Sequence, residues 1–410
     1  MNILLITGSF PPEIGSASHL FYELSQGLAE NGHNVTVITR FPRAFRVNSP
    51  ETYYRRKFFL SERIGDVRVL RIAELPIFKE SLFSRLLEQV ILPLALLLGG
   101  LISGTQDIIL NYSPPLTLGL AAFVLSKMKR APFIVNVQDL HPKAIVDLGL
   151  LKNQIVIRIL ETLERFIYCR AKYLTVHSEG NRKHVISRGA QPHTVLTIPN
   201  WADTNLRPLE KFNKFRTSNK LGSKSVITYA GIFSYSQDLD TILDCASILR
   251  EHNDIVFLLV GDGPLKSSLM AKANALKLDN MIFIPFQPRE RYPLVLSASD
   301  ICLVALRKNG VKTPVVPRKL QDIMASGRPV IANVPLDGDV PKIIRGAHCG
   351  ICVESENPKE LAEAILKLCR NPSLRDRLGR NGERYANKHY SLSTCLQKYQ
   401  TLFEQATDTA

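Results

Sequence analysis

The sequence predicts an α/β fold made of two Rossmann-like lobes, each a parallel sheet wrapped by helices. Short apolar runs of strand length alternate with longer segments of helical period in both halves of the chain. A polar stretch from about 200 to 224 has no apolar period and separates the halves. The 410 residues suffice for two full-sized cores. Two such lobes would face each other across a cleft bordered by the carboxyl ends of both sheets, where open α/β sheets bind ligands.

The first half begins with a strand, since residues 1–8 lack a basic n-region and lead into a Gly/Pro loop, which argues against a signal peptide. The clearest helix is expected over 152–171, where Ile155, Ile159, Leu163 and Ile167 recur four apart and predict one apolar face. The strands expected in this half are 2–7, 34–40, 66–72, 107–112, 132–137, 173–177 and 194–198.

The second half repeats this alternation, and a last helix near 391–406 could pack back across the lobes. Its expected strands are 225–230, 255–260, 281–285, 300–305, 329–333 and 350–353. We therefore expect an N-terminal lobe over 1–204, a linker over 205–224, a C-terminal lobe over 225–385 and a C-terminal helix over 386–410.

The seven cysteines are scattered and odd in number, which disfavours a disulfide framework and favours a reducing cytoplasm. Cys349 and Cys352 have no second Cys or His pair at zinc spacing, so no metal site is predicted. No cofactor is predicted either. The net charge of +15 favours anionic partners. Nucleic acid is not expected, because no binding motif with interleaved aromatic residues is present and the positive charge is spread over both halves.

Residues 40–85 hold 11 Lys/Arg and 5 Asp/Glu, a local excess of +6, and an uncharged apolar segment follows at 89–106. Pro93 and several glycines interrupt that segment, so a buried or interfacial helix near 86–103 is favoured over a transmembrane one. Two interpretations of the basic stretch remain open, a solvated loop and a surface that docks on an anionic leaflet.

Three loops between strand and helix carry residues suited to phosphate. The first, 8–15, ends in Gly15 at a helix entrance, where backbone N–H groups and the positive helix end attract anions, although a Pro-rich turn would look the same. The second holds Gly261 and Gly263 beside Pro264, which is also ordinary turn chemistry. The third, 314–329, places Lys319 and Asp322 three apart near a helix start, as a cation for phosphate and a carboxylate for hydroxyls, or as a surface ion pair.

Taken in order, these motifs resemble the retaining glycosyltransferases of the GT-B fold, family four, and within it the bacterial surface-polysaccharide group. The resemblance covers nearly the whole chain. The matching motifs are Phe-Pro-Pro-x-x-Gly at 10–15, Ser178-Glu179, Pro199-Asn200-Trp201-Ala202-Asp203, Gly261-Asp262-Gly263-Pro264 and Met324-Ala325-Ser326-Gly327-Arg328-Pro329-Val330-Ile331.

The resemblance implies a nucleotide-diphosphate sugar, with UDP favoured, bound by the C-terminal lobe without a metal. Gly231, Gly261 and Gly263 would border the nucleotide and diphosphate, and the backbone near Phe286 would meet the base. Lys319 and Asp322 would meet the diphosphate and the ribose or sugar. The acceptor, implied to be a polyprenyl-diphosphate-linked glycan, would bind the N-terminal lobe of an enzyme peripheral on the cytoplasmic face of the membrane. The sugar would be a deoxy or N-acetylated hexose, which makes the predicted enzyme a hexosyltransferase.

The sequence departs from the family at several positions. The usual Arg and Lys-Gly of the first C-terminal loop are missing at 231–238, and Gln237 with Lys319 would substitute for them. The family's glutamate pair is reduced to Asp322, with Pro314 at the earlier place. The N-terminal histidine is replaced within 138–142, where Asp139 is predicted as the catalytic residue and His141 is the second choice. Alternatives are a GT-B-type sugar-nucleotide epimerase and a non-catalytic sugar-nucleotide-binding protein.

Overall fold

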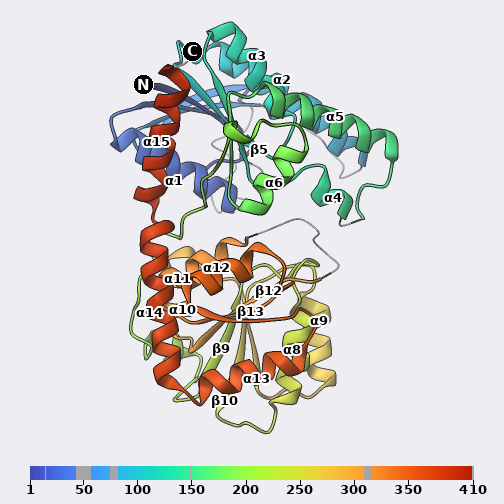
Figure 1. Cartoon of the computed structure of the whole chain (residues 1–410), viewed down its shortest axis with the longest axis vertical. Coiled ribbons are helices and arrows are strands. Elements are labelled where there is room, and N and C mark those ends of the chain that lie inside the picture. Colours follow the sequence, from blue (N-terminus) through green and yellow to red (C-terminus); the bar gives the residue numbers. More distant parts are fainter. Residues whose placement is uncertain (14, 43–56, 74–81, 148, 309–315, 409–410) are drawn as a thin grey trace. The chain divides into compact units, whose positions relative to one another are not determined.

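The computed structural model describes residues 1–13, 15–42, 57–73, 82–147, 149–308 and 316–408. The chain forms two compact units, one of Met1–Pro199 with Leu392–Ala410 and one of Asn200–Ser391 (Figure 1). The sequence predicts a first lobe that ends at 204, whereas the first unit ends at Pro199. The C-terminal helix, from Leu392 on, also belongs to this first unit. Within the basic segment expected over 40–85, residues 43–56 and 74–81 lie outside the described residues, as does Pro314.

The first unit is built on an eight-stranded sheet in the order β3-β4-β2-β1-β5-β6-β7-β8. All neighbouring strands are parallel except β3 and β4. Strand β3 was not expected, because its side chains alternate in exposure at the sheet edge and its sequence, FLSERI, is not an apolar run. The strands are β1 Asn2–Ile6, β2 Asn34–Arg40, β3 Phe59–Ile64, β4 Val67–Ile72, β5 Ile108–Ser113, β6 Phe133–Val137, β7 Tyr173–Val176 and β8 Val195–Thr197.

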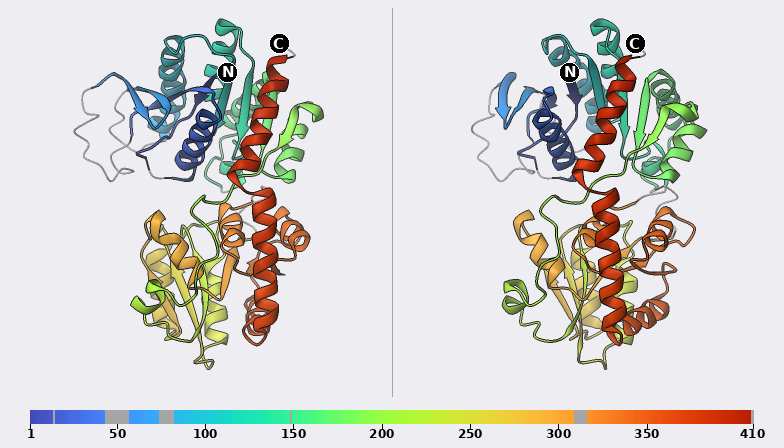
Figure 2. Two further views of the ribbon diagram at one scale, coloured as in Figure 1. Left: turned by 90° about the vertical axis from the view of Figure 1, so that its left-hand side faces the viewer. Right: turned by 60° about the vertical axis from the view of Figure 1, so that its left-hand side comes forward.

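Helices α1 (Ser16–Glu30) and α15 (Leu392–Asp408) pack on each other and against strands of this sheet. Figure 2 shows α15, in red, lying along the first unit although it is the last helix of the chain. Two small contacts fix it there. Gly27 of α1 leaves room for Leu396, since a Cβ at Gly27 would lie 2.4 Å from Leu396 Cδ1, and Asn136 donates to the hydroxyl of Tyr399 at 2.7 Å.

Helices α2 (Leu82–Leu101) and α3 (Leu118–Lys129) also contact strands of this sheet and pack on each other. A Cβ at Gly100 would lie 2.3 Å from Leu125 Cδ1, so glycine permits the close approach of the two helices. Helix α2 contains most of the apolar segment expected near 86–103. Among the helices of the described residues, none combines the length and apolarity that crossing a bilayer requires.

Helix α5 (Gln154–Arg170) forms where it was expected, capped by the side chain of Asn153. The prediction that its isoleucines share one face is wrong. Ile167 is fully buried, whereas 71% of Ile155 and 61% of Ile159 is exposed. A spacing of four exceeds the 3.6 residues of a helical turn, so the row winds by 40° at each step and passes from solvent into the core. Shorter helices α4 (Lys143–Asp147) and α6 (Glu179–Ser187) flank it in sequence.

The second unit has a six-stranded, fully parallel sheet in the order β11-β10-β9-β12-β13-β14. All six strands fall where the apolar runs predicted them. They are β9 Ser225–Ala230, β10 Ile255–Val260, β11 Met281–Ile284, β12 Ile301–Ala305, β13 Val330–Asn333 and β14 Gly350–Val353. The helices are α7 Lys214–Ser218, α8 Leu239–Ile248, α9 Lys266–Ala275, α10 Tyr292–Ser297, α11 Arg318–Ala325, α12 Asp339–Ala347, α13 Pro358–Cys369 and α14 Pro372–His389.

The stretch 205–224, expected as a linker, belongs to this second unit and is packed into it. Arg216, on α7, is buried and donates to the carbonyl of Ala298 at 2.6 Å, and its Nη1 lies 3.4 Å from Asp300. Phe215 is buried beside it. The polar stretch 205–224 is therefore ordered, because the guanidinium of Arg216 donates to several backbone carbonyls.

Candidate functional site

The candidate site is built where two loops leave the carboxyl ends of β9 and β10 in the second unit. The loops are joined by backbone hydrogen bonds. Gly231 N–H donates to the carbonyl of Val260 at 2.9 Å, and Phe233 N–H donates to the carbonyl of Asp262 at 2.8 Å. This edge of a parallel sheet is where α/β proteins bind ligands. The two predicted loops thus form one continuous surface of backbone.

Glycine is required in both loops by close contact and by backbone conformation. Gly231, Gly261 and Gly263 have φ values of 149°, 153° and 150°. A Cβ at Gly261 would lie 1.9 Å from the carbonyl oxygen of Gly231, and one at Gly263 would lie 2.6 Å from that of Phe233. Only glycine allows the loops to approach this closely.

Lys319, in the first turn of α11, reaches into this surface. Its Nζ donates to the hydroxyl of Tyr229 at 2.6 Å and to Oε1 of Gln237 at 3.1 Å, and lies 3.9 Å from the centre of the Tyr229 ring. A Cβ at Gly231 would stand 2.9 Å from the same Nζ. The structure therefore brings together Gly231, Gln237 and Lys319, which were predicted as separate contributors to the diphosphate site.

The ammonium of Lys319 pairs with polar rather than acidic side chains among the residues that the structure describes. Within the described part of the chain, its hydrogen-bond partners are the Tyr229 hydroxyl and the Gln237 amide oxygen, and no ion pair reaches it. Burial lowers the pKa of Lys319 to about 7. Burial also raises the pKa of Tyr229 above its ordinary value, so that phenol stays neutral. A buried cation that lacks a counter-charge binds an anion strongly once one is supplied.

Tyr229 was not predicted from the sequence. It is the penultimate residue of β9 and looks like an ordinary core position in the run SVITYA. Its hydroxyl accepts from Lys319 and lies 3.0 Å from both the carbonyl oxygen of Ile232 and Oε1 of Gln237, either of which can accept its single hydrogen. The only sequence signal was a polar atom at the end of an otherwise apolar strand, next to the glycine loop.

Asp322 lies one turn after Lys319 but makes a different contact. Its Oδ1 accepts from the backbone N–H of Asp203 at 2.9 Å, so it joins α11 to the Trp201-Ala202-Asp203 segment. The carboxylate of Asp203 is bound in turn by Arg289. Burial opposes ionisation of Asp203, yet the hydrogen bond from Arg289 and that from the Asn205 N–H lower its pKa overall. The predicted contact of Asp322 with ribose or sugar stays a prediction.

Phe286 follows β11 at the same carboxyl edge of the sheet. The N–H of Gly261 donates to the carbonyl of Ile284 at 3.0 Å, which ties the end of β11 to the second glycine loop. The Phe286 side chain is exposed. The side chain is therefore accessible to a ligand. That the backbone near Phe286 contacts a base stays a prediction.

In the first unit, Gly15 is the residue directly before α1. Its φ of 162° is extended backbone, and a Cβ there would meet no heavy atom within 4 Å. Its conformation therefore does not demand glycine, unlike that of Gly261. The loop before it is held by Glu13, which is buried and accepts from the Ser9 hydroxyl at 2.6 Å. Arg71 is also buried and donates to the carbonyl of Pro11, a support that the sequence did not indicate.

Asp139 and His141 follow the carboxyl end of β6. Asp139 is exposed, whereas His141 is partly buried and its backbone N–H donates to the Asp139 carbonyl at 3.1 Å. Burial lowers the pKa of His141, an effect that the charges of Asp139 and Glu164 only partly offset. Burial and the Asp139 charge together raise the pKa of Tyr112. Asp139 thus offers an accessible charge, and His141 a neutral imidazole at pH 7.

Metal-binding arrangements were searched among the described residues, and no group of three or more His, Cys, Asp or Glu side chains lies close enough to hold an ion. All seven cysteines are free. Burial raises the pKa of both Cys349 and Cys352, which keeps these thiols protonated and poor as ligands. Independence from metal stays a prediction for experiment.

Comparison with known proteins covers both units. Residues 15–201 match the family described as glycosyl transferase 4-like domain, and residues 210–385 match glycosyl transferases group 1. A protein of Escherichia coli K12 that carries the name of a colanic acid biosynthesis glycosyl transferase, WcaI, is 24% identical over 387 residues, or 89% of this chain and 91% of that protein.

Two solved structures share the architecture over nearly the full length. Sucrose-phosphate synthase of Thermosynechococcus elongatus aligns with a TM-score of 0.78 at 17% identity, covering 100% of both chains. Anabaena HepE, solved in complex with UDP, aligns with a TM-score of 0.75 at 16% identity, covering 99% of this chain and 100% of that one. At such identities these structures show the fold alone. The sequence matches and the fold together identify the chain as a glycosyltransferase with the GT-B fold, in which a glycosyl transferase 4-like domain precedes a group 1 domain.

Proposed function

We propose that the enzyme is a retaining hexosyltransferase that uses a nucleotide-diphosphate sugar, UDP-linked by preference, and acts on a polyprenyl-diphosphate-linked glycan in cell-surface polysaccharide assembly. The transferred sugar is a deoxy or N-acetylated hexose. The observation that carries the proposal is Lys319, a partly buried cation that no acidic side chain of the described residues pairs with, held between Tyr229 and Gln237 at the glycine loops.

The chemistry of the donor explains why such a lysine suits the reaction. When the sugar is transferred, the diphosphate leaves with additional negative charge, and groups fixed at that position stabilise the transition state more than the ground state. Lys319 supplies one charge, and the glycine loops beside it let a diphosphate approach the backbone closely. In this proposal the clamp relies on Lys319 and needs no metal ion.

Retention requires the acceptor hydroxyl to attack from the face that the diphosphate leaves. In this mechanism the departing phosphate oxygen takes the proton of the attacking hydroxyl, and side chains of the N-terminal unit orient the reactants. We assign that orienting role to Asp139, because it is exposed and charged, with His141 as second choice. Gly15 would border the acceptor or the donor from the start of α1.

The names of similar proteins support the substrate classes. WcaI is named for colanic acid biosynthesis, and HepE has been solved with UDP. An acceptor on a polyprenyl diphosphate stays in the bilayer, so we propose that the enzyme works at the cytoplasmic face of the membrane as a peripheral protein.

The test is a panel of UDP-, GDP- and dTDP-sugars, measured first for binding by calorimetry and then for turnover with and without a lipid-linked acceptor. The proposal expects saturable binding of a UDP-sugar and release of UDP that accelerates when acceptor is added. NMR of the product should show the donor's anomeric configuration. Conversion of the donor into an isomeric sugar nucleotide would indicate an epimerase instead, and binding without turnover on any acceptor would indicate a sensor.

A further inference from the structure

Two helices of the N-terminal unit carry apolar rows that the described residues leave exposed. On α2 the exposed residues Val90, Leu94, Leu98 and Leu101 recur at helical spacing, and 57% of Leu94 and 63% of Leu98 is exposed. On α3 the row is Leu120, Val124 and Met128. Helices α2 and α3 pack on each other and lie side by side in the first unit (Figure 1).

Helix α5 adds a third row, made of Ile155, Ile159 and Phe166. The ring of Phe166 meets the ring of Phe123 on α3 edge to face, with centroids 5.2 Å apart. This contact joins α5 to α3 while leaving both isoleucines in solvent. We call the exposed rows of α2, α3 and α5 the three-helix face. Scattered apolar residues are normal on a protein surface, but rows on three neighbouring helices are not.

Cations lie directly on the three-helix face. Lys127 sits 5.8 Å from the centre of the Phe123 ring, and Arg170 sits 5.6 Å from that of Phe166. The sequence between Val90 and Arg130 holds a single acidic residue, Asp107. The rows of α2 and α3 therefore combine apolar residues with positive charge and few acidic residues, while the acidic residues of α5, Glu161 and Glu164, are paired with Arg188.

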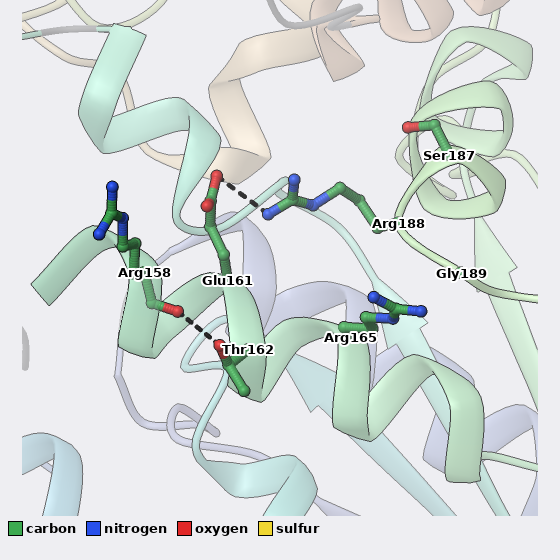
Figure 3. A pocket seen from close by; sticks show the side chains of 7 residues that line it. All are labelled: Arg158, Glu161, Thr162, Arg165, Ser187, Arg188 and Gly189. Atoms are coloured by element: carbon green, nitrogen blue, oxygen red, sulfur yellow. Dashed lines mark hydrogen bonds and ion pairs between the residues drawn. The ribbon is translucent and has the colours of Figure 1, made fainter. Parts of the chain in front are cut away.

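An arginine-lined pocket borders the α5 row. Its volume is about 570 Å³, and Arg158 and Arg165 of α5 line it together with Arg188, which follows α6 (Figure 3). Arg188 is neutralised by Glu161 at 3.0 Å and Glu164 at 2.8 Å. Arg158 and Arg165 are exposed and, within the described part of the chain, take part in no ion pair. They are positioned for an anion that approaches beside the apolar row.

We propose that the three-helix face docks on an anionic lipid leaflet, with its apolar rows at the acyl boundary and the arginine-lined pocket around a lipid phosphate. The occupant follows from charge complementarity, since a phospholipid offers an apolar and an anionic part side by side. The inference rests on the proposed lipid-linked acceptor, and it moves the docking surface from the basic segment 40–85 to helices that the structure describes. Interfacial contact requires no spanning helix.

Vesicle flotation of the full-length protein tests this surface without any measurement of activity. Wild-type protein should bind vesicles of phosphatidylcholine mixed with phosphatidylglycerol, and should bind pure phosphatidylcholine weakly. Replacing Arg158, Arg165 and Arg170 by Gln should weaken binding to the mixed vesicles roughly tenfold or more, since each basic residue near an anionic leaflet contributes separately. Replacing Leu94, Leu98 and Ile159 by Ser should weaken binding to a similar extent and leave the melting temperature unchanged, because these side chains are exposed.

Matched controls lie in the C-terminal unit, where Lys359 and Lys367 of α13 and Arg370, which directly follows it, are exposed cations. Ile248 and Met270 are exposed apolar residues of the same unit. Gln and Ser variants of these residues should bind vesicles like wild type. Equal losses in face and control variants would overturn the proposal. So would a wild-type dimer in ultracentrifugation that the Ser variant dissociates without a change in vesicle binding. Release of UDP with a soluble acceptor tests the proposed function separately, since the face variants should retain it.

Discussion

The ammonium of Lys319 lies over the ring of Tyr229 and donates to its hydroxyl at 2.6 Å, although the two residues are 90 positions apart in the sequence. The ring face and the phenolic oxygen both stabilise positive charge, so tyrosine partly compensates the burial of the lysine. It cannot neutralise the lysine. The pair therefore holds a cation in place while leaving its charge available to a ligand.

Replacing Lys319 by Ala should lower kcat by a factor on the order of 10², because a charge that acts on the leaving diphosphate contributes mainly to the transition state. Steady-state release of UDP measures this. The exposed Lys359 provides a control, and its Ala variant should turn over normally. Near-normal kcat in the Lys319 variant would show that the diphosphate is stabilised elsewhere.

Binding of UDP should weaken as the pH rises above 7. In the free protein Lys319 loses its proton with a pKa of about 7. The bound diphosphate favours the charged form, so binding above pH 7 must take up a proton, and affinity should fall by up to about tenfold per pH unit. Calorimetry between pH 7 and 9, above the range where the phosphate itself titrates, measures this. A Lys319→Met variant should bind weakly and show no such slope, whereas a slope shared by both proteins would assign the effect to another group.

Tyr229→Phe should keep the ring under Lys319 while removing the hydroxyl that contacts Lys319, Gln237 and the Ile232 carbonyl. Loss of one net hydrogen bond should cost about 1 kcal/mol of unfolding free energy. A less fixed lysine should raise the KM for the donor several-fold and lower kcat. If urea denaturation shows the loss of stability while both kinetic constants stay at wild type, Tyr229 supports the fold but does not position the lysine.

In thermal denaturation, Gly261→Ala should lower the stability of the protein, whereas Gly15→Ala should leave it nearly unchanged. At Gly261 the new Cβ would collide with the carbonyl oxygen of Gly231, and φ is 153°, so we expect at least about 2 kcal/mol of destabilisation. At Gly15 a Cβ enters open space on extended backbone, and stability should be nearly unchanged. Any defect of the Gly15 variant would then be in ligand binding, which calorimetry with UDP or an acceptor analogue can detect.

Turnover should survive EDTA, because the proposed diphosphate clamp relies on the charge of Lys319. Rates measured after dialysis against EDTA should match those in added Mg²⁺ or Mn²⁺ within about twofold. A strict requirement for either ion in single-turnover experiments would contradict the clamp.

The sequence predicted the strands and turns that depend on interactions between residues close together in the chain. Apolar runs bounded by turn residues placed all six strands of the second unit, and glycines at strand ends marked the loops that meet there. Lys319 and Gln237 were predicted as site residues from a resemblance to a family, and the structure brings their side chains together. Their site roles remain for experiment.

What the sequence did not reveal depends on long-range packing. Tyr229 matters because of a lysine 90 residues later, and a strand pattern carries no record of that partner. The edge strand β3 has a half-exposed pattern shared with many loops. The isoleucines of α5 recur at a spacing that predicts a core face, whereas the winding of the row leaves Ile155 and Ile159 exposed. In each case the local pattern was compatible with two structures, and only the tertiary neighbours decide between them.

Helix α15 has a consequence for how the molecule is made. The N-terminal unit needs residues from the last turns of the chain, since Leu396 fills the space over Gly27 and Tyr399 receives the amide of Asn136. During synthesis the C-terminal unit, which is continuous in sequence, can close before the N-terminal unit does. The N-terminal unit therefore completes its packing only after α15 has been synthesised.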